Sequence, residues 1–127
     1  MNDVVLEGAD AATVMARLQM LYDACEQAGV PVVALTNLDA DLRHHGMVPA
    51  DEVSAREATI AEVAKRVAES CRRGQCTVHG VPTRVVADAR YAMPLCAEHY
   101  DDSLHLTPAG SDRLAAVVHE TMRLCGL

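Results

Sequence analysis

The chain has 127 residues, which is the length of one domain, since domains usually hold about 100–150 residues. Half of the residues are hydrophobic but none is Phe or Trp, so we expect an aliphatic core. The formal net charge of −7, with Lys65 as the one lysine, argues against a nucleic-acid-binding surface and against a polybasic membrane patch. No apolar run approaches the roughly 20 residues of a membrane span, and residues 1–4 lack the basic and apolar regions of a secretory signal.

The first half of the chain predicts a helix followed by a strand. Apolar residues recur at helical spacing over residues 11–27, and Gly29 is the expected C-terminal cap. This helix should bury one stripe of residues: Val14, Leu18, Leu21 and Cys25. The apolar run at residues 30–36 predicts a strand buried on both faces, as in a parallel sheet. The polar residues 37–50 that follow predict a loop.

The second half predicts helix, strand and helix. A helix over residues 51–73 should end at Gly74 and bury Ile60, Val63, Ala64, Val67 and Cys71. Residues 83–88 predict a second strand, and residues 89–106 a long loop. The last helix should open at Thr107 and Pro108, a capping residue followed by proline in the first turn. It should bury Leu114, Val117, Val118, Met122 and Cys125.

This order of elements predicts an α/β fold with a parallel sheet in one domain over residues 1–127. We expect a partial three-layer, flavodoxin-like sandwich. In open α/β sheets the ligand site lies beyond the carboxyl ends of the strands. The loop at residues 89–106 leaves from that end of the sheet, so a site is expected there.

That loop contains Asp102-Ser-Leu-His105, which is the strongest functional signal in the chain. An acid three residues before a histidine can place a carboxylate against an imidazole, as the orienting group and the base of an acyl-transfer triad. The same spacing occurs at Asp41 and His44, in a segment that we interpret as a solvated loop. Only the later pair lies between a strand and a capped helix.

Asp102 and His105, with Gly110 and a closing amphipathic helix, resemble the last conserved block of the SGNH (GDSL-type) hydrolases. These enzymes are three-layer α/β esterases and acylhydrolases. The resemblance implies that Asp102 orients His105, and that His105 takes the proton from a serine hydroxyl. Residues 1–4 resemble the family's Gly-x-Asn-Asp block without its glycine, which implies Asn2 as an oxyanion-hole donor. The alternative for Asn2 is an ordinary residue of a chain terminus.

The chain departs from the family because the block that supplies the serine nucleophile is missing. None of its four serines is expected on the strand-to-helix turn that exposes a nucleophile: Ser54, Ser70, Ser103 and Ser111. We therefore expect the C-terminal portion of an SGNH hydrolase domain, inactive by itself, whose complete form hydrolyses a small-molecule ester without a cofactor. The alternative is a non-catalytic interaction module, in which the exposed edge of the sheet pairs with a partner chain or with a second copy.

The cysteines raise two further alternatives. Cys71 and Cys76 are close enough in sequence to pair across a helix end if the protein is exported. Two Cys-x-x-His pairs could form a small zinc-binding domain: Cys76 with His79, and Cys96 with His99. A strand at residues 83–88 would span roughly 20 Å and hold these pairs apart, so no metal site is predicted.

Overall fold

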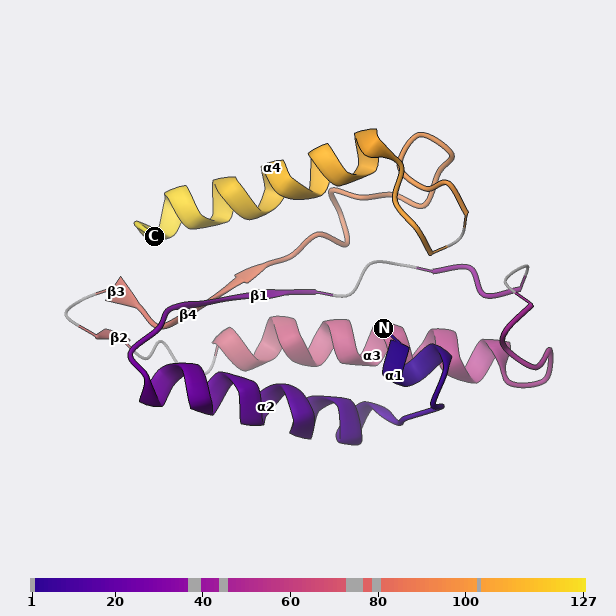
Figure 1. The fold of residues 1–127 in the computed structure, drawn as a ribbon, viewed down its shortest axis with the longest axis horizontal. Helices are drawn as coiled ribbons and strands as arrows, with labels where there is room; N and C mark the ends of the chain where they lie inside the picture. The colour runs from indigo at the N-terminus through magenta and orange to yellow at the C-terminus, as the bar shows by residue number, and fades with distance from the viewer. Residues whose placement is uncertain (1, 37–39, 44–45, 73–76, 79–80, 103) are drawn as a thin grey trace.

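A computed structural model describes residues 2–36, 40–43, 46–72, 77–78, 81–102 and 104–127. In these ranges helices and short strands alternate along the chain (Figure 1). The elements are α1 (Asn2–Val5), α2 (Ala11–Gln27), β1 (Val32–Leu35), α3 (Val53–Arg72), β2 (Thr77–Val78), β3 (Val81–Pro82), β4 (Arg84–Ala87) and α4 (Pro108–Cys125). The predicted mixture of helix and strand is confirmed.

β1 and β4 form a parallel sheet, with α3 as the crossover between them. The register runs from Val32 opposite Arg84 to Leu35 opposite Ala87. Both strands lie inside the segments predicted for them and are shorter than those segments. The sequence analysis missed two small elements, α1 and the antiparallel pair of β2 with β3.

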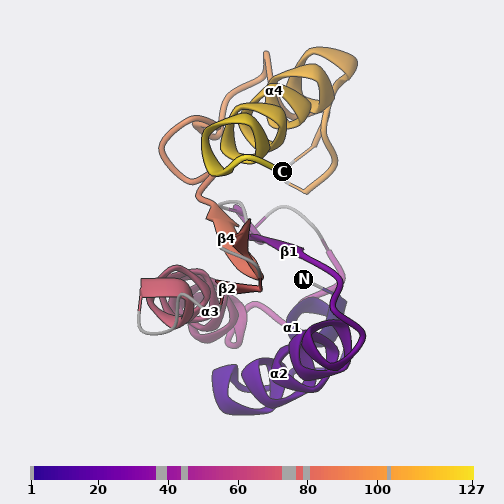
Figure 2. The same cartoon turned by 90° about the vertical axis from the view of Figure 1, so that its left-hand side faces the viewer.

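Helices cover both faces of this parallel pair. α4 lies on one face, while α1, α2 and α3 lie on the other (Figure 2). Because successive side chains of a strand alternate between faces, Ala34 joins the core beneath the sheet and Leu35 lies toward α4. The larger core is therefore the one between the sheet and α1, α2 and α3.

α3 contributes most to that core, and its predicted stripe is largely confirmed. Ile60, Val63 and Val67 are each at most 3% exposed. The stripe predicted on α2 is partly wrong, because Leu21 is 63% exposed and Tyr22 is buried instead. Tyr22 lies toward the strands, where the guanidinium of Arg84 stacks 4.3 Å from its ring centre.

Gly29 follows α2 as predicted, with the positive φ of 67° that glycine tolerates. It belongs to a Schellman motif, because its N–H donates to the carbonyl of Glu26 and the N–H of Val30 donates to that of Cys25. The predicted N-terminus of α4 is also confirmed, since the Thr107 side chain accepts from the N–H of Gly110 at 3.0 Å.

α4 is less buried than predicted. Met122 is 37% exposed, and the other four residues of its predicted stripe are only half-buried: Leu114, Val117, Val118 and Cys125. The strand at residues 30–36 was also predicted to be buried on both faces, yet Val30 is 51% exposed and Leu35 is 39% exposed. Val30 is exposed because it precedes β1 and is not part of the strand. For α4 and Leu35 the cause is that, within the described residues, the parallel sheet is two strands wide, which is too narrow to cover α4 or to flank β1 on both sides.

None of the described helices is both long enough and apolar enough to cross a membrane.

Candidate active site

The segment between β4 and α4 carries Asp102 and His105 beyond the carboxyl ends of both strands (Figure 1). The segment folds back on itself. Tyr100 and Leu106 form an antiparallel bridge, and the N–H of Asp101 donates to the carbonyl of His105 at 2.9 Å. Met93 and Tyr100 of this segment are buried, and the N–H of Thr107, which caps α4, donates to the carbonyl of His99 at 2.9 Å. The pair therefore sits on a closed turn that is attached to the start of α4.

Within this turn the two oxygens of Asp102 have different partners. Oδ2 lies 2.7 Å from Nδ1 of His105. Oδ1 accepts from the backbone N–H groups of Leu104 and His105, both at 2.7 Å. One oxygen thus holds the backbone while the other orients the imidazole, which is how an acid positions a catalytic base. The His105 side chain is 72% exposed, so a substrate can reach the ring.

The same contacts set the charges of the pair. Hydrogen bonds from the His105 side chain, and then from the backbone N–H groups of His105 and Leu104, hold the pKa of Asp102 far below its usual 3.8. In turn, the hydrogen bond to the Asp102 carboxylate, and then its charge, raise the pKa of His105 above 6.5. Asp102 therefore remains ionised at neutral pH and strengthens His105 as a base.

Asn2, the expected oxyanion donor, is the first residue of α1 and is exposed. α1 is tied down from two sides. Arg17 of α2 forms ion pairs with Asp3 and Glu7 at 2.7 and 3.1 Å, and the buried Val4 and Val5 pack against α3. α1 lies on the face of the sheet opposite α4, toward the end of the molecule that holds the Asp102 turn (Figures 1 and 2).

The serines that the structure describes lie on helices. Ser54 and Ser70 are on α3, and Ser70 Oγ donates to the carbonyl of Val67 at 2.8 Å. Ser111 is in the first turn of α4. Several other candidate positions lie outside the described residues or side chains: Cys71, Cys76, His79, His44 and Ser103. The Cys71–Cys76 disulfide and the four-residue zinc set are therefore not described, and neither is the second Asp-x-x-His pair.

Known proteins offer no guide to this site. Comparisons with family models, with curated proteins and with solved structures return no significant match to the chain.

Sequence reasoning missed a polar cluster at the carboxyl end of the sheet. Thr36 follows β1 and is 1% exposed, and its hydroxyl lies 3.2 Å from Oδ1 of Asp88 and accepts from the N–H of Ala89 at 3.0 Å. Arg90 binds the same carboxylate with two nitrogens, at 2.8 and 2.6 Å. A polar residue directly after each of two strands was the available signal. This cluster ties the two strand ends together.

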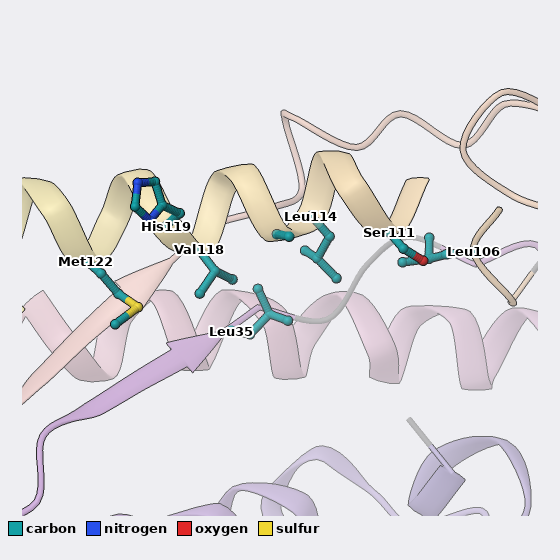
Figure 3. A pocket seen from close by; sticks show the side chains of 8 residues that line it. Leu35, Leu106, Ser111, Leu114, Val118, His119 and Met122 are labelled. Atoms are coloured by element: carbon teal, nitrogen blue, oxygen red, sulfur yellow. The ribbon is translucent and has the colours of Figure 1, made fainter. Parts of the chain in front are cut away.

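A groove of about 440 Å³ runs along α4 beside the end of β1 (Figure 3). Leu35 points up from β1 toward Leu114 and Val118 of α4, and Met122 lies farther along the helix. Leu106, the neighbour of His105, lines the groove near the N-terminus of α4. The apolar groove therefore reaches the residue that follows His105 in the sequence.

Proposed function

We propose that this chain supplies the general base and its orienting acid, His105 and Asp102, to a serine-type ester hydrolase. The main observation behind this proposal is the 2.7 Å contact between Asp102 Oδ2 and His105 Nδ1. The other carboxylate oxygen, Oδ1, stabilises the turn by accepting from backbone N–H groups. Three further features support the proposal: the turn lies beyond the carboxyl ends of parallel strands, the imidazole is exposed, and the pKa of His105 is raised. The resemblance to the last block of the SGNH hydrolases supplies the reaction class.

In the proposed mechanism His105 removes the proton of a serine hydroxyl while that oxygen attacks the ester carbonyl. The imidazolium then returns the proton to the leaving alcohol, and a second cycle with water releases the acid. Asp102 stays ionised throughout and stabilises the imidazolium. Asn2 is the proposed amide donor to the oxyanion, a role that can contribute about 3 kcal/mol to transition-state stabilisation. The serine comes from a polypeptide segment outside this chain, as does the remainder of the flavodoxin-like sheet.

The direct test begins with the reading frame upstream of Met1, which should encode a Gly-Asp-Ser block and a glycine just before Met1. The longer protein should hydrolyse p-nitrophenyl esters and react with a fluorophosphonate probe. Asp102→Asn should lower kcat by about 10⁴-fold, as loss of the orienting acid does in a triad. His105→Ala should abolish turnover, while His44→Ala, a histidine at the same spacing from an acid, is the matched control.

Retained activity in His105→Ala would contradict the proposal, as would equal losses in His105→Ala and His44→Ala. A stop codon directly upstream of Met1 would remove the proposed origin of the serine.

A second candidate function is strand pairing with a partner chain, which the edge of β1 favours. The N–H of Val32 donates to the carbonyl of Thr83, the residue before β4, at 2.8 Å, and the N–H of Thr36 donates to Ala87 of β4 at 3.2 Å. Because alternate residues of a strand bond the same neighbour, Val33 and Leu35 direct their backbone groups to the other edge. That edge adjoins the apolar groove, and an exposed apolar edge of this kind can template pairing.

The test is the molar mass in solution between low and high micromolar concentration, by light scattering on the eluting protein. Self-pairing predicts a mass that rises with concentration and falls back to the monomer in Leu35→Lys, since a charge at an edge blocks pairing. Leu21→Lys, on the exposed part of α2, is the matched control. A monomer at every concentration would exclude self-pairing.

A further inference from the structure

Three potential metal ligands gather on the segment between β4 and α4, apart from the Asp102–His105 contact. The thiol of Cys96, a carboxylate oxygen of Glu98 and an imidazole nitrogen of His99 all lie within 4.8 Å of one another. The backbone explains why they meet. The N–H groups of His99 and Tyr100 both donate to the carbonyl of Cys96 at 3.0 Å, which forms one helical turn. Residues three apart on such a turn lie on the same side.

The separation of two of these ligands matches a zinc coordination shell. Zinc binds sulfur at about 2.3 Å and imidazole nitrogen at about 2.0–2.1 Å, so a tetrahedral angle places the two atoms about 3.6 Å apart. Cys96 Sγ and His99 Nδ1 lie 3.5 Å apart. An ion could therefore enter with little movement of either atom, and the nearby Glu98 oxygen offers a third ligand.

The backbone of these residues is already held in place. The carbonyl of Glu98 accepts from the Thr107 hydroxyl at 2.6 Å, and the carbonyl of His99 accepts from the Thr107 N–H at 2.9 Å. Thr107 caps α4, so the turn is attached to the start of a long helix. Ligands on a backbone held in this way lose less conformational freedom on binding than ligands on a free loop.

We propose that Cys96, Glu98 and His99 bind a zinc ion, with the fourth position open to water. A thiolate with an imidazole favours zinc over the hard cations Mg²⁺ and Ca²⁺, which prefer oxygen ligands. Binding releases the thiol proton of Cys96. His99 Nδ1 also lies 3.2 Å from the carbonyl of Pro94, so coordination through Nδ1 places the ring proton on Nε2 and ends that contact.

The ion would cross-link Cys96, Glu98 and His99, which directly precede the turn closed by Tyr100 and Leu106. It would thereby stabilise the segment that presents Asp102 and His105. This role does not depend on the proposed hydrolase activity, because it concerns binding and the order of the turn. It also differs from the set of two Cys-x-x-His pairs, since it needs neither Cys76 nor His79.

The first experiment titrates the metal-free 127-residue protein with Zn²⁺ in competition with a chromophoric chelator, which measures affinity and stoichiometry. A second titration with Co²⁺ measures the charge-transfer absorption that shows coordination by a thiolate. We expect one ion per chain. Cys96→Ser and His99→Ala should weaken zinc binding more than about 100-fold, since loss of an outer-shell group alone costs about 10–100-fold. Glu98→Gln keeps an oxygen ligand without its charge and should weaken binding by about 10–100-fold. Circular dichroism without metal establishes that each variant is folded.

The control variants are Cys76→Ser, His79→Ala and Cys25→Ser, which should bind zinc as the unmodified protein does and keep the cobalt band. Loss of binding in Cys76→Ser or His79→Ala would overturn the proposal in favour of the four-residue set. Absence of stoichiometric zinc would also overturn it, as would a Cys96→Ser protein that retains the cobalt band. An unchanged affinity in Glu98→Gln would remove Glu98 from the ligand set.

Discussion

Gly110 packs directly against the carbonyl group of His99. A Cβ atom at residue 110 would overlap the carbonyl oxygen of His99 and would lie 2.9 Å from its carbonyl carbon. Gly110 is buried in the first turn of α4, where its N–H also donates to Thr107 Oγ1. The glycine therefore permits the close approach of the helix to the turn that carries the candidate site. The family resemblance included Gly110, and the structure gives this residue a packing role.

Gly110→Ala should destabilise the protein even though alanine is the better helix former. Helix propensity alone favours alanine by about 1 kcal/mol, whereas overpacking against fixed backbone typically costs about 1–3 kcal/mol. We expect the midpoint of urea unfolding to fall. Ser111→Ala, one position along and exposed, should change the free energy of unfolding by less than about 0.5 kcal/mol. A stabilised Gly110→Ala protein would contradict the packing described here.

Asp102→Asn should lower the pKa of His105. In the unmodified protein the Asp102 carboxylate raises this pKa above 6.5, and an amide supplies neither the charge nor the same acceptor. Imidazole resonances followed by NMR from pH 4 to pH 9 measure the change directly. The downward shift should be confined to His105, and His44→Ala identifies one of the other histidine signals. An unchanged His105 titration would show that the 2.7 Å contact does not persist in solution.

The pair should also make the stability of the protein depend on pH in a defined window. The folded pKa of His105 is raised, so its contribution is fully present below the unfolded value of 6.5 and is lost as the pH rises through the folded pKa. The folded pKa of Asp102 is lowered, so its contribution is present above 3.8 and is lost as the pH falls. The difference in thermal midpoint between the unmodified protein and Asp102→Asn should be largest between these pH values. A difference that grows above pH 8 would contradict this assignment.

The three long helices and the two strands of the parallel sheet were predictable because they depend on local pattern. The buried face of α3 repeats at helical spacing, and Thr107 with Pro108 fixes the start of α4 by cap chemistry. The Asp102–His105 contact was predictable for the same reason, since it joins residues three apart on one turn. These features need no knowledge of what lies across the sheet.

What the sequence analysis missed depends on contacts between distant segments. Met122 fits an apolar stripe, yet its exposure is decided by the width of the sheet beside α4. Leu21 fits one too, but Tyr22 is the residue of α2 that lies toward the strands. Leu42 lies in a polar segment that predicted a solvated loop, but it is fully buried and its N–H donates to Glu57 of α3 at 2.9 Å.

Thr36→Val should destabilise the protein although the two side chains have nearly the same shape. Thr36 is 1% exposed, and its hydroxyl accepts from the N–H of Ala89 while lying 3.2 Å from Asp88 Oδ1. Valine leaves a buried N–H without this acceptor, a loss of about 1–3 kcal/mol. Chemical denaturation measures it. Thr59→Val is the matched control, because the Thr59 hydroxyl donates to the carbonyl of Ala55 within α3, and it should lose less than half as much. Equal losses would contradict a special role for the strand ends.

Arg56→Met should release α1 from α3 while leaving α4 undisturbed. The Arg56 side chain is 15% exposed, and Nη1 donates to the carbonyls of Val4 and Val5, the last residues of α1. Methionine keeps much of the aliphatic packing but removes the guanidinium donor from both carbonyls. The Val4 carbonyl then keeps the N–H of Gly8, whereas the Val5 carbonyl loses the donor described for it.

Hydrogen exchange checks this prediction, because the N–H groups of Gly8 and Ala9 donate back to Val4 and Asp3 of α1 and should exchange faster. The control Arg66→Met removes an exposed i,i+4 ion pair with Glu62. It should leave the exchange rates of Gly8 and Ala9 unchanged and alter the free energy of unfolding by less than about 0.5 kcal/mol. Faster exchange in α4 as well would mean that Arg56 supports the whole fold. Unchanged exchange at Gly8 would mean that Val4 and Val5 hold α1 by apolar packing alone, and the placement of Asn2 would then rest on that packing.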